Sequence, residues 1–249
     1  NALNFDESAL CDNGSCVFGD DVVSNLEEEL SVFETVEEEQ DYSMSFDGLD
    51  DYVETSYLGI SESNKRSISV SASNGYGCLF SYGGENDLNG LKDAFLCLLN
   101  EHNNSIEINI DYSTYQFQLD ELLNWNNFTI LLPNNSNSLS DLLVYQNGNL
   151  LEFLGGNDGV INTVLEVPIN IGRNYRNQNY YSGTINNLIV WDTALSQNEI
   201  QSYNLCPPSG DEESIVGYWN FNEGTGDTVY DISGNGNHGI IYGATYIED

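Results

Sequence analysis

Short alternating segments, punctuated by turn residues, constrain the fold of this chain more than any other feature. From residue 42 onward, runs rich in β-branched and aromatic residues are separated by Gly, Asn, Asp and Ser. Segments such as SISVSAS, SIEINIDY and FTILLP match the strand pattern of roughly four to eight residues, and about a dozen of them follow one another. Such a succession predicts an all-β protein with two stacked antiparallel sheets.

Two local signals add detail to this prediction. The QNGN step inside LLVYQNGNLLEF predicts a hairpin, because Asn-Gly readily supplies the positive φ angles of a two-residue turn. In DTALSQNEIQSY, Ser196 and Glu199 form a capping box, which predicts the start of a helix. Leu195, Ile200 and Tyr203 would share one face of that helix. We therefore expect one short helix at the rim of the sandwich.

The first 41 residues differ from the rest of the chain. A small, cysteine-bearing stretch is followed by acidic runs at Glu27–Glu29 and Glu37–Glu39, which indicate a solvated connector. The predicted organisation is a cysteine-containing insert and acidic connector over residues 1–41 and a β-sandwich over residues 42–249.

Charge narrows the choice of partners. The chain carries 40 Asp and Glu against 5 Lys and Arg, a formal net charge of -35. Such a surface repels phosphate backbones and anionic lipids, so we expect neither nucleic-acid binding nor direct membrane insertion. Clustered carboxylates and Asn amides are the oxygen ligands that calcium prefers. Solubility is the alternative explanation for the acidity.

The five cysteines lack the paired spacing of a zinc site. Cys78 and Cys97 lie in apolar runs that read as neighbouring strands, and Cys11 and Cys16 bracket a short turn. We predict disulfides for both pairs, with a buried free thiol as the alternative. Disulfides favour an extracellular or cell-surface location.

Several motifs resemble one known family. YSMSFDGLDDYVE resembles a strand of the laminin-G-like and concanavalin A-like jelly-roll domains, and YSGTINNLIVWDTALSQNEIQSY resembles their closing signature. The stretch WNNFTILLPNNSNSLSDLLVYQNGNLLE is similar to their central hairpin, and IVGYWNFNEGTGDTVYDISGNGNHGIIYGATY to the strand that normally opens such domains. The resemblance covers residues 42–249 and implies a two-sheet antiparallel jelly-roll sandwich.

The order and flanks of these motifs carry further implications. Because the usual opening motif comes last, residues 215–249 either complete this sandwich or open a next repeat. Completion is favoured, since an isolated three-strand fragment is marginal in water. Residues 206–214 look like a linker. ALNFDESALCDNGSC resembles an insert between modules of large secreted Bacteroidetes proteins, which implies a multi-module surface protein whose neighbouring copies or modules are partners.

The turn-rich segments FDGLDD and DISGNGNHG are the best candidates for a metal site, because calcium needs six to eight oxygens from flexible backbone. Relatives often hold calcium at the rim of the sandwich. The alternative is that Asn and Gly occur there because they tolerate left-handed turns. The predicted calcium ligands are Asp47, Asp50, Asp51, Asp231, Asn235 and Asn237.

Carbohydrate binding needs an exposed aromatic platform with polar partners. The loop NYRNQNYYSG offers Tyr175, Tyr180, Tyr181 and Arg176. Loop aromatics also pack beneath their own loop, which is the alternative. Trp125, Trp191 and Trp219 lie within strand motifs and are predicted to be core residues.

Catalysis is not expected, although some concanavalin-like glucanases carry paired carboxylates on one strand. Glu107 and Asp111 lie about 13 Å apart by strand rise, whereas retaining hydrolysis needs about 5 to 5.5 Å. Asn109 occupies the middle position where the family has Asp. A glycoside hydrolase is therefore a remote alternative.

Two threonines are candidate glycan acceptors, and the motifs together predict a function. Thr193 and Thr228 match the Bacteroidetes O-glycosylation pattern and are candidate acceptors. We expect a non-catalytic extracellular module of a surface adhesin or filament, with calcium-stabilised loops. The alternative is a lectin-like module that binds surface glycans.

Overall fold

The structure is a computed structural model, and it describes residues 41–84, 94–110, 112–120, 125–165, 167–174 and 176–249. The predicted insert and connector before residue 41 thus lie outside the described residues. The strands are β1 (Tyr42–Asp47), β2 (Tyr52–Thr55), β3 (Arg66–Gly83), β4 (Ala94–Asn100), β5 (Ser105–Ile110), β6 (Ser113–Gln118), β7 (Asn126–Leu132), β8 (Leu143–Gln146), β9 (Asn149–Leu150), β10 (Phe153–Gly156), β11 (Asn170–Ile171), β12 (Ser182–Trp191), β13 (Ile215–Trp219), β14 (Thr228–Val229), β15 (Gly239–Tyr242) and β16 (Thr245–Glu248). A 3₁₀ turn covers Leu139–Asp141, and the helix α1 covers Gln197–Leu205.

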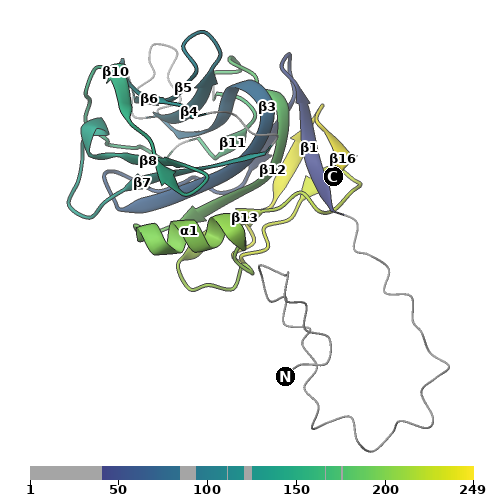
Figure 1. Cartoon of the computed structure of the whole chain (residues 1–249). Helices are drawn as coiled ribbons and strands as arrows, with labels where there is room; N and C mark the ends of the chain where they lie inside the picture. The colour runs from purple at the N-terminus through teal and green to yellow at the C-terminus, as the bar shows by residue number, and fades with distance from the viewer. Residues whose placement is uncertain (1–40, 85–93, 111, 121–124, 166, 175) are drawn as a thin grey trace, which may run out of the picture.

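The strands form two antiparallel layers (Figure 1). Sheet I has the order β16-β1-β12-β3-β7-β8-β9, with β13 beside the second half of β12. Sheet II has the order β10-β6-β5-β4-β3-β11-β2-β15-β14. The prediction of an all-β, two-sheet antiparallel jelly-roll sandwich with one short helix is confirmed.

The long strand β3 belongs to both sheets. Its first part pairs with β7 and β12 in sheet I, and its second part pairs with β4 and β11 in sheet II. Glycines stand where the strand changes sheet. A Cβ on Gly75 would lie 2.2 Å from the carbonyl oxygen of Ser182, and one on Gly77 would lie 2.4 Å from that of Tyr180. Only glycine lets the two chain segments pass this closely.

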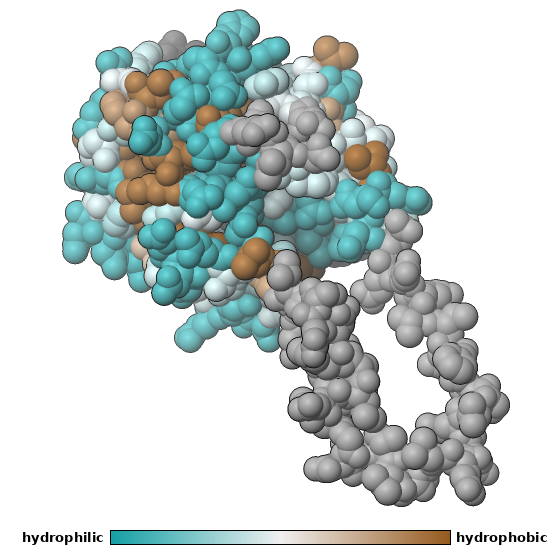
Figure 2. Space-filling view, in the orientation of Figure 1, coloured by the Kyte–Doolittle hydropathy of each residue, from teal (hydrophilic) through white to brown (hydrophobic). Residues whose placement is uncertain are grey.

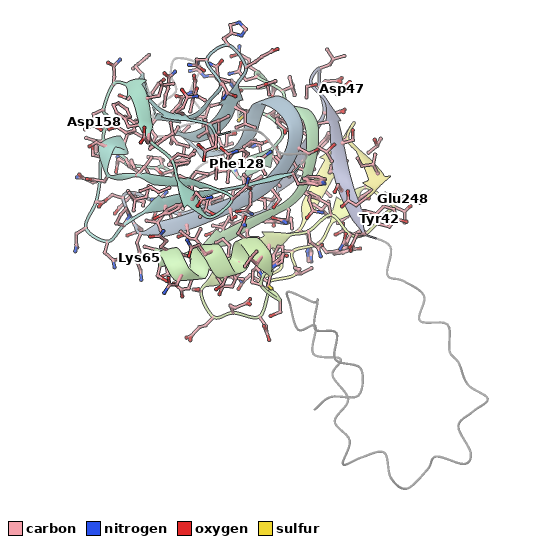
Figure 3. The ribbon with its side chains drawn as sticks, viewed as in Figure 1. Tyr42, Asp47, Lys65, Phe128, Asp158 and Glu248 are labelled. Atoms are coloured by element: carbon pink, nitrogen blue, oxygen red, sulfur yellow. The ribbon has the colours of Figure 1, made fainter. Side chains whose placement is uncertain are left out.

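The core fills the space between the sheets, because inward-facing apolar residues alternate with outward-facing polar ones. Phe128 lies near the middle of the sandwich (Figure 3) and is 1% exposed. Trp191 and Trp219 are buried as predicted. The prediction for Trp125 is wrong, since this residue precedes β7 rather than lying within it and is 38% exposed.

The final segment of the chain pairs with strands that come earlier in the chain, among them the first two. β13 lies along β12, β15 along β2 and β16 along β1. Tyr42 is opposite Glu248 in the β1–β16 pair, and the two residues lie at the end of β1 away from Asp47 (Figure 3). Trp219, from β13, is fully buried in the common core.

The local predictions for the helix and hairpin are confirmed. Ser196 accepts a hydrogen bond from the backbone N–H of Glu199, which closes the capping box at the start of α1. Ile200 is buried against the outer face of sheet I, and the ring of Tyr203 stacks on Trp191. Asn147 and Gly148 have φ angles of 52° and 76° at the β8–β9 turn. Among the described residues, no helix is long and apolar enough to cross a membrane.

Candidate functional site

A polar pocket lies on the outer face of sheet II, where β3, β4 and β5 run side by side. Its volume is about 410 Å³, within the range of small-molecule sites. The lining residues come from these three strands, from the β4–β5 turn and from the loop before β12. They are Tyr76, Gly77, Leu98, Leu99, Asn100, Glu101, His102, Glu107, Asn109 and Asn179.

Strand alternation places the polar residues of this pocket on the outer face. In β5, Ile106, Ile108 and Ile110 enter the core, so Glu107 and Asn109 project to the other side. Glu107 stands opposite Leu98 of β4, and Asn109 stands opposite Leu96. Polar groups therefore lie beside an apolar floor, an arrangement that suits an amphipathic ligand.

Hydrogen bonds hold the carboxylate of Glu107 in one orientation. Its Oε1 accepts from Nδ2 of Asn100 and from Nε2 of Gln116, each at 2.7 Å. These donors come from β4 and β6, the strands on either side of β5. The carboxylate is thus fixed before any ligand binds.

Asn109 provides an unpaired acceptor. Its side-chain oxygen is buried and has no hydrogen-bond partner. A buried acceptor without a partner costs free energy, and a bound donor would remove that cost. This oxygen and Glu107 are the groups best placed to receive ligand hydroxyls.

The loop before β12 forms one wall of the pocket. The backbone carbonyl of Asn179 accepts a hydrogen bond from the backbone N–H of Cys78, which fixes the loop against β3. The side chain of Asn174 accepts from the backbone N–H groups of Arg176 and Gln178 and so shapes the turn.

The described residues of the predicted aromatic platform, Tyr180, Tyr181 and Arg176, do not line this pocket. Tyr181 is fully buried, and burial raises the pKa of its hydroxyl, so the prediction that it contacts a ligand is wrong. Its ring packs edge-on against Phe46, beneath the loop. Tyr180 is partly buried and Arg176 is exposed, while Tyr175 lies outside the described residues.

The predicted metal ligands fall into two separate groups. Asp47, Asp50 and Asp51 come together in the turn between β1 and β2, with one carboxylate oxygen of each within 4.8 Å of the others. Asp51 is 8% exposed and accepts a hydrogen bond from the backbone N–H of Asp47. Burial raises the pKa of Asp51, and the nearby carboxylates of Asp47 and Asp50 raise it further. The three carboxylates are therefore close enough to share one cation.

The second group does not join the first. Asp231 accepts from the backbone N–H groups of Tyr218, Ser233 and Asn237, so its carboxylate organises its own loop. The Asn235 and Asn237 side chains donate to backbone carbonyls of β13.

Register explains why a single site of all six residues is wrong. The Asp231 loop meets the sandwich beside the Gly239 end of β15, and Asp51 lies beyond the Tyr242 end. By strand rise, the two groups are roughly 15 to 20 Å apart.

The prediction of a Cys78–Cys97 disulfide is also wrong, because both are free buried thiols. Their strands are neighbours, as expected, but Cys97 pairs with Phe80 and Cys78 with Leu98. Cys97 faces the core between the sheets, whereas Cys78 packs with Ala94, Leu96 and Leu98 on the outer face. Side chains on opposite faces of a sheet cannot form a disulfide. Cys11 and Cys16 lie outside the described residues.

The candidate glycan acceptors occupy different surroundings. Thr193 is partly exposed, and its hydroxyl accepts a hydrogen bond from Lys65. Thr228 is partly exposed on the edge strand β14 and bonds to Asp227. Both positions stay predictions.

Sequence reasoning placed Glu107 and Asn109 on one face of a strand but did not identify the pocket. Asn100, His102 and Asn179 come from segments whose proximity depends on the β3–β4–β5 register. No local signal in the sequence marks Asn100 or His102, whereas Asn179 lies in the loop that the sequence had already indicated for carbohydrate binding.

Comparisons with known proteins agree with this fold. No protein-family model matches the chain, and no curated protein does. A solved structure of a candidate carbohydrate-binding protein from Bacteroides ovatus superposes with a TM-score of 0.59 at 15% identity, over 84% of this chain and 60% of that one. The chain thus spans less than two thirds of that protein's length.

Two further solved structures are more distant. A heptameric pentraxin of Limulus polyphemus gives a TM-score of 0.49 at 16% identity, over 68% of this chain and 83% of that one. Domains LG4-5 of the mouse laminin α1 chain give a TM-score of 0.44 at 12% identity, over 63% of this chain and 44% of that one. At these identities the comparisons show the fold alone. The chain is a jelly-roll sandwich of the concanavalin-like kind.

Proposed function

We propose that this chain is a non-catalytic carbohydrate-recognition module, and that the pocket beside Glu107 and Asn109 holds the sugar. The observation that carries the proposal is the buried, unpaired oxygen of Asn109 next to a carboxylate held by two amides. Sugar hydroxyls are donors that satisfy such acceptors, and Leu98 offers an apolar surface for a ring face.

The charge of the site selects for neutral sugars. Glu107 and Glu101 are the carboxylates that line the pocket, and the described lining contains no Lys or Arg. A carboxylated or phosphorylated glycan would meet like charges there. Neutral glycans, whose hydroxyls donate to carboxylates, fit this environment.

The proposed role is binding rather than hydrolysis. Asn109 stands where a second carboxylate on the same face of β5 would be needed. Glu101 comes from the exposed β4–β5 turn. A module that binds glycans without hydrolysing them suits an adhesive surface protein. We therefore also propose an extracellular location for this chain.

An array of neutral and acidic glycans tests the proposed function, followed by calorimetry on any hits. We expect binding of neutral glycans, a loss of at least about tenfold in affinity for Glu107→Ala and Asn109→Ala, and no release of reducing sugar. Ile240→Ala is the matched control, because Ile240 is exposed on the same sheet several strands away. Equal affinity in all three variants would contradict the assignment of the pocket.

A second proposal concerns the Asp47–Asp50–Asp51 turn, which we infer to be a calcium site that stabilises the loop. Its support is the close approach of three carboxylates at the upper end of β1, where Figure 3 labels Asp47. Hard oxygen ligands of this kind suit calcium, which would offset their mutual repulsion. A structural role between neighbouring copies or modules would use the same stabilisation.

Thermal unfolding with calcium and with chelator tests this second proposal. Calcium should raise the melting temperature of the wild type and have little effect on Asp50→Asn. Asp192→Asn, an exposed carboxylate after β12, is the control and should respond like the wild type. Identical melting curves with calcium and chelator in the wild type would exclude a calcium site at this turn.

A further inference from the structure

A second pocket lies on the outer face of sheet I, on the opposite side of the sandwich from the first. Its floor is formed by β12 and β3, where Asn187 stands directly opposite Ser71. Trp125, just before β7, and Pro207, just after α1, form walls, and Asp249 follows β16. The volume is about 270 Å³, near the lower limit for small-molecule sites.

Asn187 brings an unsatisfied polar group into this pocket. Its side chain is only 6% exposed, and its Nδ2 donates to the side-chain oxygen of Asn186 at 2.9 Å. Its own Oδ1 is buried without any hydrogen-bond partner. Native structures rarely leave such an oxygen unpaired, so this oxygen indicates a ligand donor.

The surrounding polar groups are already ordered. The carboxylate of Asp249 accepts from the hydroxyl of Ser43 at 2.6 and 2.7 Å and from Nδ2 of Asn186 at 3.0 Å. The hydroxyl of Ser71 accepts from Nδ2 of Asn127 at 3.1 Å. The Asp249 carboxylate and the Asn187 oxygen are therefore acceptors held in place, while the Ser71 hydroxyl can still donate, and together they suit a ligand that carries hydroxyl groups.

Trp125 supplies the aromatic surface. It is 38% exposed, while Trp191 and Trp219 are at most 1% exposed. A half-exposed indole beside fixed acceptors matches a ring that has one apolar face and hydroxyl groups at its edge. An anionic ligand is disfavoured by Asp249 and by the net charge of the chain.

We propose that the Trp125–Asn187 pocket is a second saccharide site, which takes a single neutral pyranose ring stacked on Trp125 with a hydroxyl donating to Asn187. The site is independent of the first pocket, because the two lie on different sheets. Two sites on opposite faces would let one module bridge two glycan chains.

The test uses the methyl glycosides of glucose, galactose, mannose and N-acetylglucosamine. Because the other tryptophans are buried, a sugar-induced change in tryptophan emission reports on Trp125. We expect at least one glycoside to give a saturable change in the wild type. Saturation-transfer NMR then measures the affinity of each variant for that glycoside. The affinity should fall about tenfold in Trp125→Ala and stay within about threefold of the wild-type value in Trp125→Phe, because phenylalanine keeps a stacking face. Asn187→Ala should weaken binding as well.

Glu107→Ala separates this proposal from the proposed function. Its effect should be confined to the first pocket, so emission changes at Trp125 should persist in this variant. If no glycoside changes the emission, or if Glu107→Ala removes all binding while Trp125→Ala removes none, the second site does not exist. A response to tetramethylammonium without a response to any sugar would also overturn the assignment. Near-UV circular dichroism confirms that each variant is folded.

Discussion

The carboxylate of Glu107 and the side-chain amide of Gln116 meet across β5 and β6 at 2.7 Å. The two residues are direct partners in the register of these strands. Asn100 donates to the same carboxylate oxygen from β4. Three consecutive strands of sheet II therefore fix one carboxylate at the edge of a pocket, and the first prediction follows from this arrangement.

Gln116→Ala should weaken glycan binding by roughly three- to tenfold through loss of orientation, whereas Glu107→Ala should weaken it more. Gln116 does not line the pocket, so its effect can act only through Glu107. Calorimetry with the glycan found on the array measures both. Equal losses in the two variants would mean that Gln116 contacts the sugar or that the fold has changed.

Asp51→Asn should stabilise the calcium-free protein at neutral pH. Burial and neighbouring carboxylates raise the pKa of Asp51 in the folded state. The folded state therefore binds the proton of the Asp51 carboxyl group more tightly than the unfolded state does. That contribution favours folding at low pH and is lost as pH rises from the ordinary Asp value of about 3.9 through the raised folded value. Urea unfolding between pH 3 and pH 8 should show that the free energy of unfolding of the variant increases relative to that of the wild type as pH rises.

Arg66→Met should lower the free energy of unfolding by about 3 kcal/mol or more. The Arg66 side chain is 1% exposed and donates to the backbone carbonyls of Ile60, Glu62 and Asn64 and to the hydroxyl of Tyr82. Removing it deprives the carbonyl of Ile60 and the hydroxyl of Tyr82 of this donor at buried positions. Tyr82→Phe should cost less, about 1 to 2 kcal/mol, because only one bond is lost. Urea unfolding ranks the two variants, and a reversed order would contradict this reasoning.

Removal of residues 215–249 should prevent folding. The deletion takes away the partners of β1, β2 and part of β12, together with the buried side chains of Trp219, Phe221 and Val229. Circular dichroism and limited proteolysis of the shortened chain provide the measurement. A protease-resistant, β-rich product would show that the remaining strands suffice.

Cys78 and Cys97 should resist iodoacetamide in the native protein and react in urea. Burial raises the pKa of both thiols, which keeps them protonated as well as inaccessible. Mass spectrometry after alkylation, with and without urea, reads out each site. Rapid native labelling of either cysteine would show that its strand opens to solvent.

The surface also carries a feature to which we assign no function. Figure 2 shows apolar side chains gathered over the region of β8 and β10, and the exposed apolar residues there include Leu150, Phe153 and Leu154. Phe153 stacks on Tyr115, so part of this patch extends the core to the edge of sheet II. It lies apart from the linings of both pockets.

Local rules in the sequence determined the elements of this protein. The alternation in SIEINI places Glu107 and Asn109 on one face of β5. Asn147 and Gly148 form the turn of the hairpin, and Ser196 with Glu199 caps the start of the helix. Each of these depends on residues close in the chain, where backbone sterics and nearby hydrogen bonds decide the conformation.

Tertiary structure alone decided which elements meet. The bulge in β3 between Cys78 and Phe80 sets the register with β4 and separates the two thiols, and the length of β15 keeps Asp231 away from Asp51. Trp125 and Asn187 are far apart in the chain and share a pocket only after sheet I forms. Register and layer packing are non-local, since they minimise the free energy of the whole core, and no short stretch of sequence contains them.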